Sequence, residues 1–265
     1  MVYNYGGGQS KSQVDRVRRH YVTDCTHEQG YRDRRCWFLS VDSGYVLSQL
    51  GKNIDTDKQL SVYTNAKSIG AGFHGVAYEL LLHNAVREAY VNQKPIVLTM
   101  REGSEYEKIE IQAEVDCCGE DEASCYAHLS KLRDGTYWHP DYPFFPFINA
   151  VATCKAFPSK NDADGRGQDL SETIVAYIQV TIRSEKNFKE KNLRQLNEEM
   201  DKNLSLKGMK RAFVVVGPDF GICKIFDLKG APDPATFLTM VGCFSPEQLK
   251  QQNRSEQTSL ALGIH

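Results

Sequence analysis

The sequence predicts a mixed α/β fold, and three observations lead to this prediction. Residues 73–90 carry apolar side chains at spacings that suit a helix. Residues 173–183 place an aliphatic side chain at every second position, the period of a strand. Residues 187–204 are highly charged, with apolar positions three or four apart, as in an amphipathic helix. With the strands around them, we interpret the order of the core elements as helix, three strands, helix, strand.

The first helix follows a glycine-containing turn at Gly70 and Gly72. Its apolar residues occur in runs that cannot alternate across a strand, and they cover most of the helix circumference. Glu79, His83 and Arg87, at positions i, i+4 and i+8, form one narrow polar stripe on this helix.

The strands are predicted from alternation and from their boundaries. Residues 96–100 form a short apolar strand, and residues 108–116 alternate apolar with polar side chains. The prolines between 134 and 146 exclude a long regular element, and a buried strand follows within 147–154. A polar loop is expected at 158–167. Two further strands, joined by a tight turn, are predicted at 211–218 and 221–228.

The pattern divides the chain into three parts. Residues 1–60 have weak periodicity and are expected to form a partly ordered lead-in. Residues 61–230 contain all the strongly patterned segments and form the expected domain. Residues 231–265 are predicted to be a tail of loops with at most one short helix.

Composition places the chain among ordinary globular proteins. It has 265 residues, of which 41% are hydrophobic and 25% charged, and a net charge of -2. A uniformly basic, histone-like surface is therefore excluded. Between residues 183 and 211, however, nine basic residues stand against five acidic ones, so any contact with nucleic acid is expected on that face. Scattered cysteines and the lack of a long apolar run favour a reduced, intracellular protein with no membrane contact.

Two groups of residues invite a ligand on composition alone. The opening GGGQSKS has glycines and a lysine, but Ser10 precedes Lys11, and no strand leads into the glycines as a phosphate loop requires. Soft metal ligands occur in two clusters, without the paired C-x-x-C spacing of zinc sites. These clusters are Cys25, His27 and Cys36, and then Cys117, Cys118, Cys125 and His128. The sequence favours ordinary thiols at both.

Polar residues inside the predicted strands are more informative. Gln179 and Thr181 project from the same side of the strand at 173–183, and Asn149 stands within the preceding strand. If the helix carrying Glu79 packs beside these strands, three oxygen ligands meet at one point. The alternative is that these residues form the solvent-facing sides of a helix and a sheet.

Four segments resemble, in order, the C-terminal region of Crinkler effectors and of the trypanosomatid retrotransposon hot spot proteins. They are GVAYELLLH at 75–83, DGTYWHPDYPFFPFINA at 134–150, IVAYIQVTIRSEKNF at 174–188 and RAFVVVGPDF at 211–220. The resemblance covers about residues 70–220. It implies a restriction-endonuclease-like PD-(D/E)XK fold, whose core has the same order of elements.

The resemblance also implies the catalytic and metal-binding positions. Family nucleases hold Mg²⁺ with a helix glutamate and two strand acids, and a lysine activates water. The corresponding residues are Glu79, Asn149, Gln179 and Thr181, of which only Glu79 is charged. Because two unit charges about 4 Å apart interact by about 4 kcal/mol at an effective dielectric of 20, this loss weakens Mg²⁺ binding. Candidate substitutes are Asp141, Asp169, Glu172 and Glu185 for the acids, and Lys155 and Lys186 for the lysine.

The sequence thus leads to one favoured function and two alternatives. The favoured function is a nuclease-derived domain that binds DNA, RNA or a nuclear protein partner and has weakened or lost cleavage, with Mg²⁺ the only cofactor expected. The contacts to phosphates would come from Lys186, Lys189, Lys191 and Arg194. The alternatives are an active Mg²⁺-dependent phosphodiesterase that uses Glu79, and a partner-binding relic without a site. Family resemblance suggests a nuclear location.

Overall fold

The computed structural model describes residues 17–21, 37–41, 54–69, 71–142, 144–159 and 171–249. The chain divides into two units, Met1–Asn53 and Ile54–His265. Within the first unit, strands β1 (Val17–Tyr21) and β2 (Trp37–Val41) pair antiparallel.

The second unit contains one large mixed sheet and five labelled helices. Its helices are α2 (Thr56–Ile69), α3 (Ala71–Val91), α4 (Glu122–Leu129), α5 (Glu190–Asp201) and α6 (Phe220–Ile225). Its strands are β3 (Ile96–Met100), β4 (Tyr106–Ile111), β5 (Glu114–Cys118), β6 (Thr136–Pro140), β7 (Ala150–Pro158), β8 (Glu172–Val180), β9 (Glu185–Asn187), β10 (Lys210–Gly217), β11 (Asp227–Lys229) and β12 (Leu238–Cys243).

The large sheet has the strand order β4-β3-β12-β10-β8-β7-β6-β5. Because β4 also pairs with β7, six of these strands close into a ring, and β6 and β5 extend from it. The neighbours of β10, which are β8 and β12, run parallel to it, and β7 is antiparallel to β8. A smaller pair, β9 with β11, is parallel.

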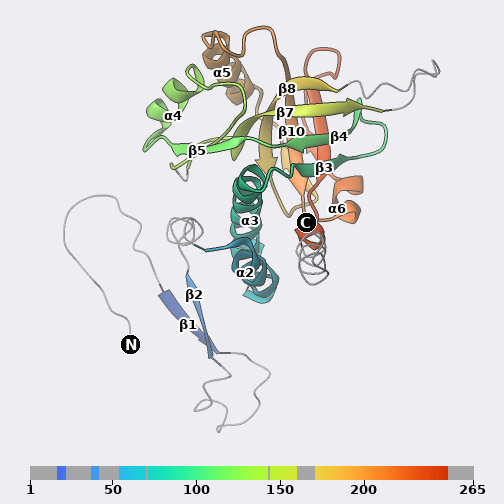
Figure 1. Cartoon of the computed structure of the whole chain (residues 1–265). Helices are drawn as coiled ribbons and strands as arrows, with labels where there is room; N and C mark the ends of the chain where they lie inside the picture. Colours follow the sequence, from blue (N-terminus) through green and yellow to red (C-terminus); the bar gives the residue numbers. More distant parts are fainter. Residues whose placement is uncertain are drawn as a thin grey trace, which may run out of the picture. The chain divides into compact units, whose positions relative to one another are not determined.

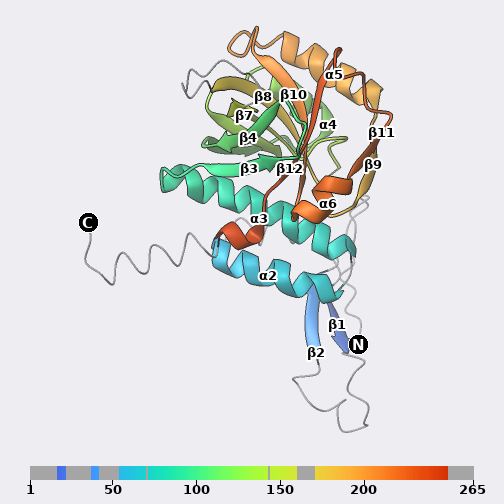
Figure 2. The same cartoon turned by 90° about the vertical axis from the view of Figure 1, so that its right-hand side faces the viewer.

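Helices cover both sides of this sheet, with α4 and α5 on one side and α3 on the other (Figure 1). The side of the sheet that faces α3 forms one apolar cluster, to which all six ring strands contribute. The other side of β7, β8, β10 and β12 packs with α4, α5 and α6 in a second cluster. The helix α3 lies between the sheet and α2 (Figure 2), which explains why apolar side chains surround it.

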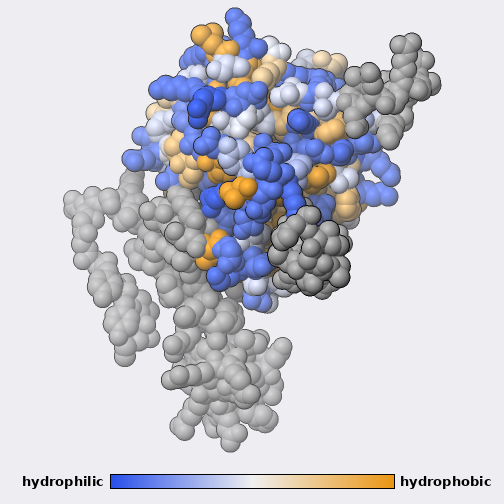
Figure 3. Space-filling view, in the orientation of Figure 1, coloured by the Kyte–Doolittle hydropathy of each residue, from blue (hydrophilic) through white to orange (hydrophobic). Residues whose placement is uncertain are grey.

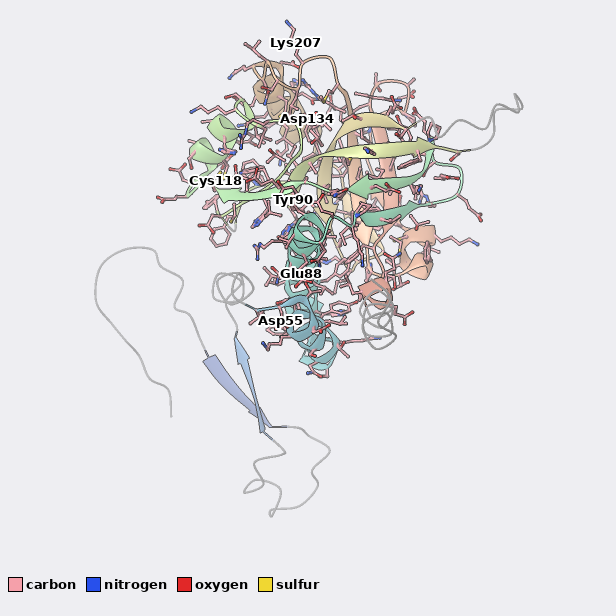
Figure 4. The ribbon with its side chains drawn as sticks, viewed as in Figure 1. Asp55, Glu88, Tyr90, Cys118, Asp134 and Lys207 are labelled. Carbon is pink, nitrogen blue, oxygen red and sulfur yellow. The ribbon has the colours of Figure 1, made fainter. Side chains whose placement is uncertain are left out.

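The start of α2 is fixed by two carboxylates. Asp55 Oδ1 accepts a hydrogen bond from the Lys58 backbone N–H at 2.8 Å, as a helix N-cap does. Glu88 of α3 accepts a further bond from the Thr56 N–H at 2.9 Å. Figure 4 labels Asp55 and Glu88 at this junction between α2 and α3. The compact unit therefore begins at Ile54, before the residue 61 expected from the sequence.

The mixed α/β prediction and its main elements are confirmed, with shifted ends. The helix expected at 73–90 is α3, and the strands at 96–100 and 211–218 are β3 and β10. The long strand at 173–183 is β8, which ends at Val180. The amphipathic helix at 187–204 is the shorter α5. The loop at 158–167 lies largely outside the described residues.

Two strand predictions were wrong. Residues 108–116 form parts of two strands, because β4 pairs with β3 and β7 whereas β5 pairs with β6. Residues 221–228 are mostly helix α6, where Asp219 Oδ1 accepts a bond from the Ile222 N–H at 2.8 Å. That N-cap outweighs the strand preference of the isoleucines and the phenylalanine.

The C-terminal stretch also differs from the expected loop. Its strand β12 inserts between β10 and β3 in the ring. At Gly242 a Cβ would overlap the Met100 side chain, so the crossing of β12 and β3 requires glycine. Among the described residues, no helix combines the length and the apolar character needed to cross a membrane.

Candidate functional site

Asn149 and Gln179, two of the residues singled out by sequence, contact one another where β7 begins and β8 ends. Gln179 Nε2 donates to Asn149 Oδ1 at 2.5 Å, and the Val180 N–H donates to the same oxygen at 2.8 Å. The Asn149 N–H in turn donates to the Ile178 carbonyl at 2.8 Å. Asn149 thus extends the β7–β8 ladder with both its backbone and its side chain.

A strained turn delivers Asn149 to this position. Phe147 has φ of 80°, which few non-glycine residues adopt, and the Ile148 N–H donates to the Pro146 carbonyl across it at 3.0 Å. This is a γ-turn with positive φ, a conformation that costs roughly 1–3 kcal/mol. The Phe147 ring holds it in place, because it stacks on Phe213 with 4.6 Å between ring centroids and meets Phe188 edge-on.

Gln179 is the last but one residue of β8, and Thr181 directly follows the end of that strand. Val175 and Tyr177, which lie on the same side of β8 as Gln179, belong to the cluster that faces α4 and α5. Gln179 is only 5% exposed, so the alternative of a solvent-facing polar side does not apply to it. Thr181 Oγ1 accepts a bond from the Arg183 N–H at 3.1 Å and shapes the exit from β8.

Glu79 is held in a different environment, on α3. Its carboxylate Oε1 lies 3.6 Å from Nε2 of the buried His83, and His83 Nδ1 is 2.8 Å from the Tyr137 hydroxyl. His83 also stacks on His139, with ring centroids 4.4 Å apart. Burial, and then the charge of Glu79, raises the pKa of Tyr137. The polar stripe of this helix is therefore partly internal.

The structure brings the two amides together but does not join Glu79 to them by a hydrogen bond. The helix α3 packs against one side of the sheet, while Gln179 shares the other side of β8 with Tyr177. The helix α3 does approach the chain just after β8 at Gly75. A Cβ at Gly75, one helical turn before Glu79, would lie 3.8 Å from Ile182, just beyond β8.

Lys186 is a cation whose pKa is affected by the charge of Glu79. It lies on β9, six residues after β8. Burial lowers the pKa of Lys186 to about 8; the Glu79 charge opposes this shift, and Arg183 and Lys189 add to it. A lysine with a pKa near neutrality can exchange protons at physiological pH. Of the two lysines proposed as substitutes, Lys155 lies toward the opposite end of β7, paired with Thr173.

The residues present do not fit a Mg²⁺ site. One oxygen of Asn149 already accepts two hydrogen bonds, and Gln179 presents a nitrogen to it. Of the possible replacement acids, Glu172 is at the far end of β8 and bonds Tyr106, and Glu185 pairs with Lys229 at 2.5 Å. Asp141 interacts with Cys117, and Asp169 lies outside the described residues. Glu79 is then the one acid left from the predicted set, and a single carboxylate does not make a Mg²⁺ site.

The predicted phosphate-binding residues surround the start of α5. Lys186 and Lys189 precede the helix, and Lys191 and Arg194 are exposed on it. Arg194 pairs with Glu190 at 3.3 Å. Lys189 occupies the N-cap position but makes no side-chain capping bond, so it leaves first-turn N–H groups available. The face seen in Figure 3 is mainly hydrophilic, with only small separate apolar patches.

A cluster of possible metal ligands lies elsewhere, on β5 and α4. Ligand atoms of Asp116, Cys118 and His128 all lie within 4.8 Å of one another. The sequence had marked the cysteine and the histidine but missed Asp116. The sequence did contain an indication of Asp116, since Asp116 and Cys118 are two residues apart on a strand and therefore share one face. The other soft-ligand cluster, at residues 25–36, lies outside the described residues.

One cavity of about 600 Å³ opens at the other end of the parallel strands, by the start of β10. Its lining includes Asp201, Lys210 and Arg211. These charges are already matched, since Arg211 pairs with Asp201 at 2.8 Å and Lys210 with Glu105. The cavity therefore offers little uncompensated charge to a ligand.

Comparisons with known proteins add no relative to this picture. Neither a scan against protein-family models nor searches of curated proteins and of solved structures find a match to this chain.

Proposed function

We propose that this domain binds the phosphate backbone of nucleic acid at the β8–α5 junction and does not cleave it with a bound Mg²⁺ ion. The proposal includes descent from the nuclease-like region that the Crinkler and retrotransposon hot spot proteins share. Support for this ancestry comes from the contact between Asn149 and Gln179, and from a chain order in which β7 and β8 precede α5 and β10 follows it, although β3, β4, β5, α4 and β6 stand between α3 and β7.

One observation carries the binding proposal. Four basic side chains gather between the end of β8 and the first turn of α5, and none forms an ion pair with a described residue. They are Arg183, Lys186, Lys189 and Lys191. Elsewhere, exposed cations such as Lys202 and Lys229 are paired with neighbouring acids. Unpaired cations beside uncapped helix N–H groups are suited to phosphate.

The hydrogen bonds of Asn149 support the absence of metal-dependent cleavage. Metal-dependent phosphodiester hydrolysis needs acidic oxygens free to coordinate the ion. Here the amide oxygen is engaged by Gln179 and by the Val180 N–H. Contacts to phosphate alone carry no base preference, so we expect binding to depend on charge and strand form rather than on sequence.

The test is fluorescence anisotropy with labelled single- and double-stranded DNA and RNA over a series of salt concentrations. In the triple variant Lys186→Ala, Lys189→Ala, Lys191→Ala we expect the slope of log affinity against log salt to fall by roughly 2 to 3. The matched control is Lys207→Ala, an exposed lysine after α5 that Figure 4 labels far from α3. Equal slopes in the triple variant and the control would contradict the proposal.

A second candidate, retained phosphodiesterase activity, is favoured by the electrostatic interaction between Lys186 and Glu79. A lysine whose pKa is about 8, and which interacts with the charge of a carboxylate, can donate or accept a proton in catalysis. A cleavage assay on plasmid and single-stranded substrates, with and without Mg²⁺ or Mn²⁺, separates the two functions. Cutting that disappears in Glu79→Gln supports the second candidate. Binding without cutting supports the first.

A further inference from the structure

The side chains of Asp116, Cys118 and His128 converge on one point between β5 and α4. One ligand atom from each lies within 4.8 Å of the other two. Cys118 lies on β5, at the edge of the sheet next to α4 (Figure 4). Among the described residues, no further histidine, cysteine or carboxylate atom joins the group at this spacing.

Local structure holds each of the three residues in place. Asp116 and Cys118 share one face of β5, and His128 is in the last turn of α4. The chain reverses between them at Gly119, whose φ is 101° and where a Cβ would overlap the Cys125 sulfur. Asp121 and Ser124 then start α4 with a reciprocal capping box. The convergence therefore follows from a defined turn and a capped helix.

Trp138 on β6 contacts both elements that carry the cluster. It pairs with Asp116 in the β5–β6 register, and its Nε1–H donates to the Cys118 carbonyl at 3.2 Å. The Trp138 ring also stacks on His128, with 5.9 Å between ring centroids. Trp138 is fully buried, so both ligand-bearing elements rest on a fixed surface.

The histidine nitrogen in this cluster has no satisfactory partner of its own. His128 Nε2 is buried and makes no hydrogen bond with a described residue, although Asp116 Oδ2 lies 2.8 Å away. The distance allows an ion pair, but the directions do not suit a hydrogen bond. Buried polar atoms are normally satisfied, so an atom in this state calls for another ligand.

A nucleophilic role for Cys118 is a weaker explanation. In a Cys-His-Asp relay the acid and the thiol contact different ring nitrogens, whereas here the three ligand atoms converge. Burial also raises the pKa of Cys118 to about 11, with Asp116 adding to the effect, which is opposite to the activation of a catalytic thiol.

We propose that Asp116, Cys118 and His128 bind a single Zn²⁺ ion, or another thiophilic divalent cation, with the fourth position left to solvent. Zinc holds sulfur, nitrogen and oxygen ligands at about 2.0–2.3 Å, which places ligand atoms about 3.3–3.7 Å apart in a tetrahedron. The ligand atoms of the three residues all lie within 4.8 Å of one another, and a bound ion would bring them to these separations through side-chain rotation. The ion would fasten the edge strand to the helix, independently of any nucleic-acid binding at α5.

The experiment uses the full chain, stripped of metal with a chelator under reducing conditions. Zn²⁺ is titrated against a chromophoric chelator, and Co²⁺ is then added as a spectroscopic probe. We expect one ion to depend on this site, and an absorption band from thiolate-to-cobalt charge transfer. Cys118→Ser should abolish the band, and His128→Gln should weaken Zn²⁺ binding by more than about 100-fold.

The matched control is Cys117→Ser, which changes the neighbouring thiol on the opposite face of β5 and should leave both signals unchanged. Asp116→Asn keeps the shape of a partly exposed side chain and guards against a failure to fold, and it should weaken binding without affecting circular dichroism. A charge-transfer band that persists in Cys118→Ser, or equal Zn²⁺ affinity in Asp116→Asn and wild type, would overturn the proposal.

Discussion

The amide pair at β7–β8 and the ligand cluster at β5–α4 are both polar groups on the same sheet, but their bonding differs. Asn149 accepts two hydrogen bonds and its backbone continues the ladder, so it is internally satisfied. In the β5–α4 cluster, the three ligand atoms face one another and His128 Nε2 makes no hydrogen bond with a described residue. The first arrangement serves the fold, and the second is suited to an external ligand.

The largest expected effect is loss of the amide pair. Asn149→Ala leaves the buried Val180 N–H without its acceptor and leaves Gln179 Nε2 only its bond to the Val180 carbonyl, which should lower the free energy of unfolding by about 2–4 kcal/mol. Urea denaturation measures it. In the double variant with Gln179→Met, the loss should be smaller than the sum of the single losses. A loss below about 0.5 kcal/mol in Asn149→Ala would mean that the pair is not structural.

The next largest effect is stabilisation of the fold by Zn²⁺ bound at the β5–α4 cluster. If Zn²⁺ binds only the folded chain, Zn²⁺ at 100 times its dissociation constant should raise the free energy of unfolding by about 2.7 kcal/mol. Thermal or urea unfolding with and without Zn²⁺ checks this. The same addition should have no effect on Cys118→Ser. Equal stabilisation of wild type and variant would place the bound ion elsewhere.

Lys186 gives a smaller, pH-dependent effect. Its folded-state pKa of about 8 is below the ordinary 10.5, so its burial is unfavourable below pH 8 and the penalty fades as pH rises to 10.5. Allowing for the partial exposure of Lys186, the variant Lys186→Met should have a free energy of unfolding about 1–2 kcal/mol higher than wild type at pH 7. The gain should disappear near pH 10.5. A gain that does not vary with pH would indicate improved packing instead.

The smallest expected effect is that of Asn149→Asp, a variant that tests whether one added charge restores a Mg²⁺ site. Asn149→Asp keeps the oxygen that accepts two hydrogen bonds and adds a second, charged oxygen. Without metal, the stability should change by less than about 1 kcal/mol. Mg²⁺ at its dissociation constant should then stabilise the variant by about 0.4 kcal/mol and leave wild type unchanged. Titration calorimetry gives an independent measure, and equal Mg²⁺ binding by wild type would contradict the view that Asn149 prevents it.

The sequence predicts those elements whose pattern agrees with their packing. The period of β8 was clear because the α3 side of that strand is wholly aliphatic, from Ile174 to Val180. Helix α6 was missed because a local N-cap at Asp219 decided the structure of a segment with strand composition. Strand β12 was missed because its neighbours in the ring are distant in sequence.

The candidate site was predictable only in part, for a similar reason. Alternation along β8 placed Gln179 correctly, and its partner Asn149 was identified from the adjacent segment. The sequence could not indicate that the side-chain oxygen of Asn149 would accept hydrogen bonds from β8, since its position depends on the γ-turn at Phe147. It could not indicate the convergence of Asp116 with His128 either, which depends on the turn at Gly119.

The position of β12 in the ring has a consequence for how the protein is made. As the chain leaves the ribosome, β3 and β10 are synthesised before the strand that joins them. Until residues 238–243 emerge, both strands expose unpaired backbone edges, which are prone to association with other chains. Closure of the ring therefore has to wait for β12, and a nascent chain stalled before this strand should bind chaperones.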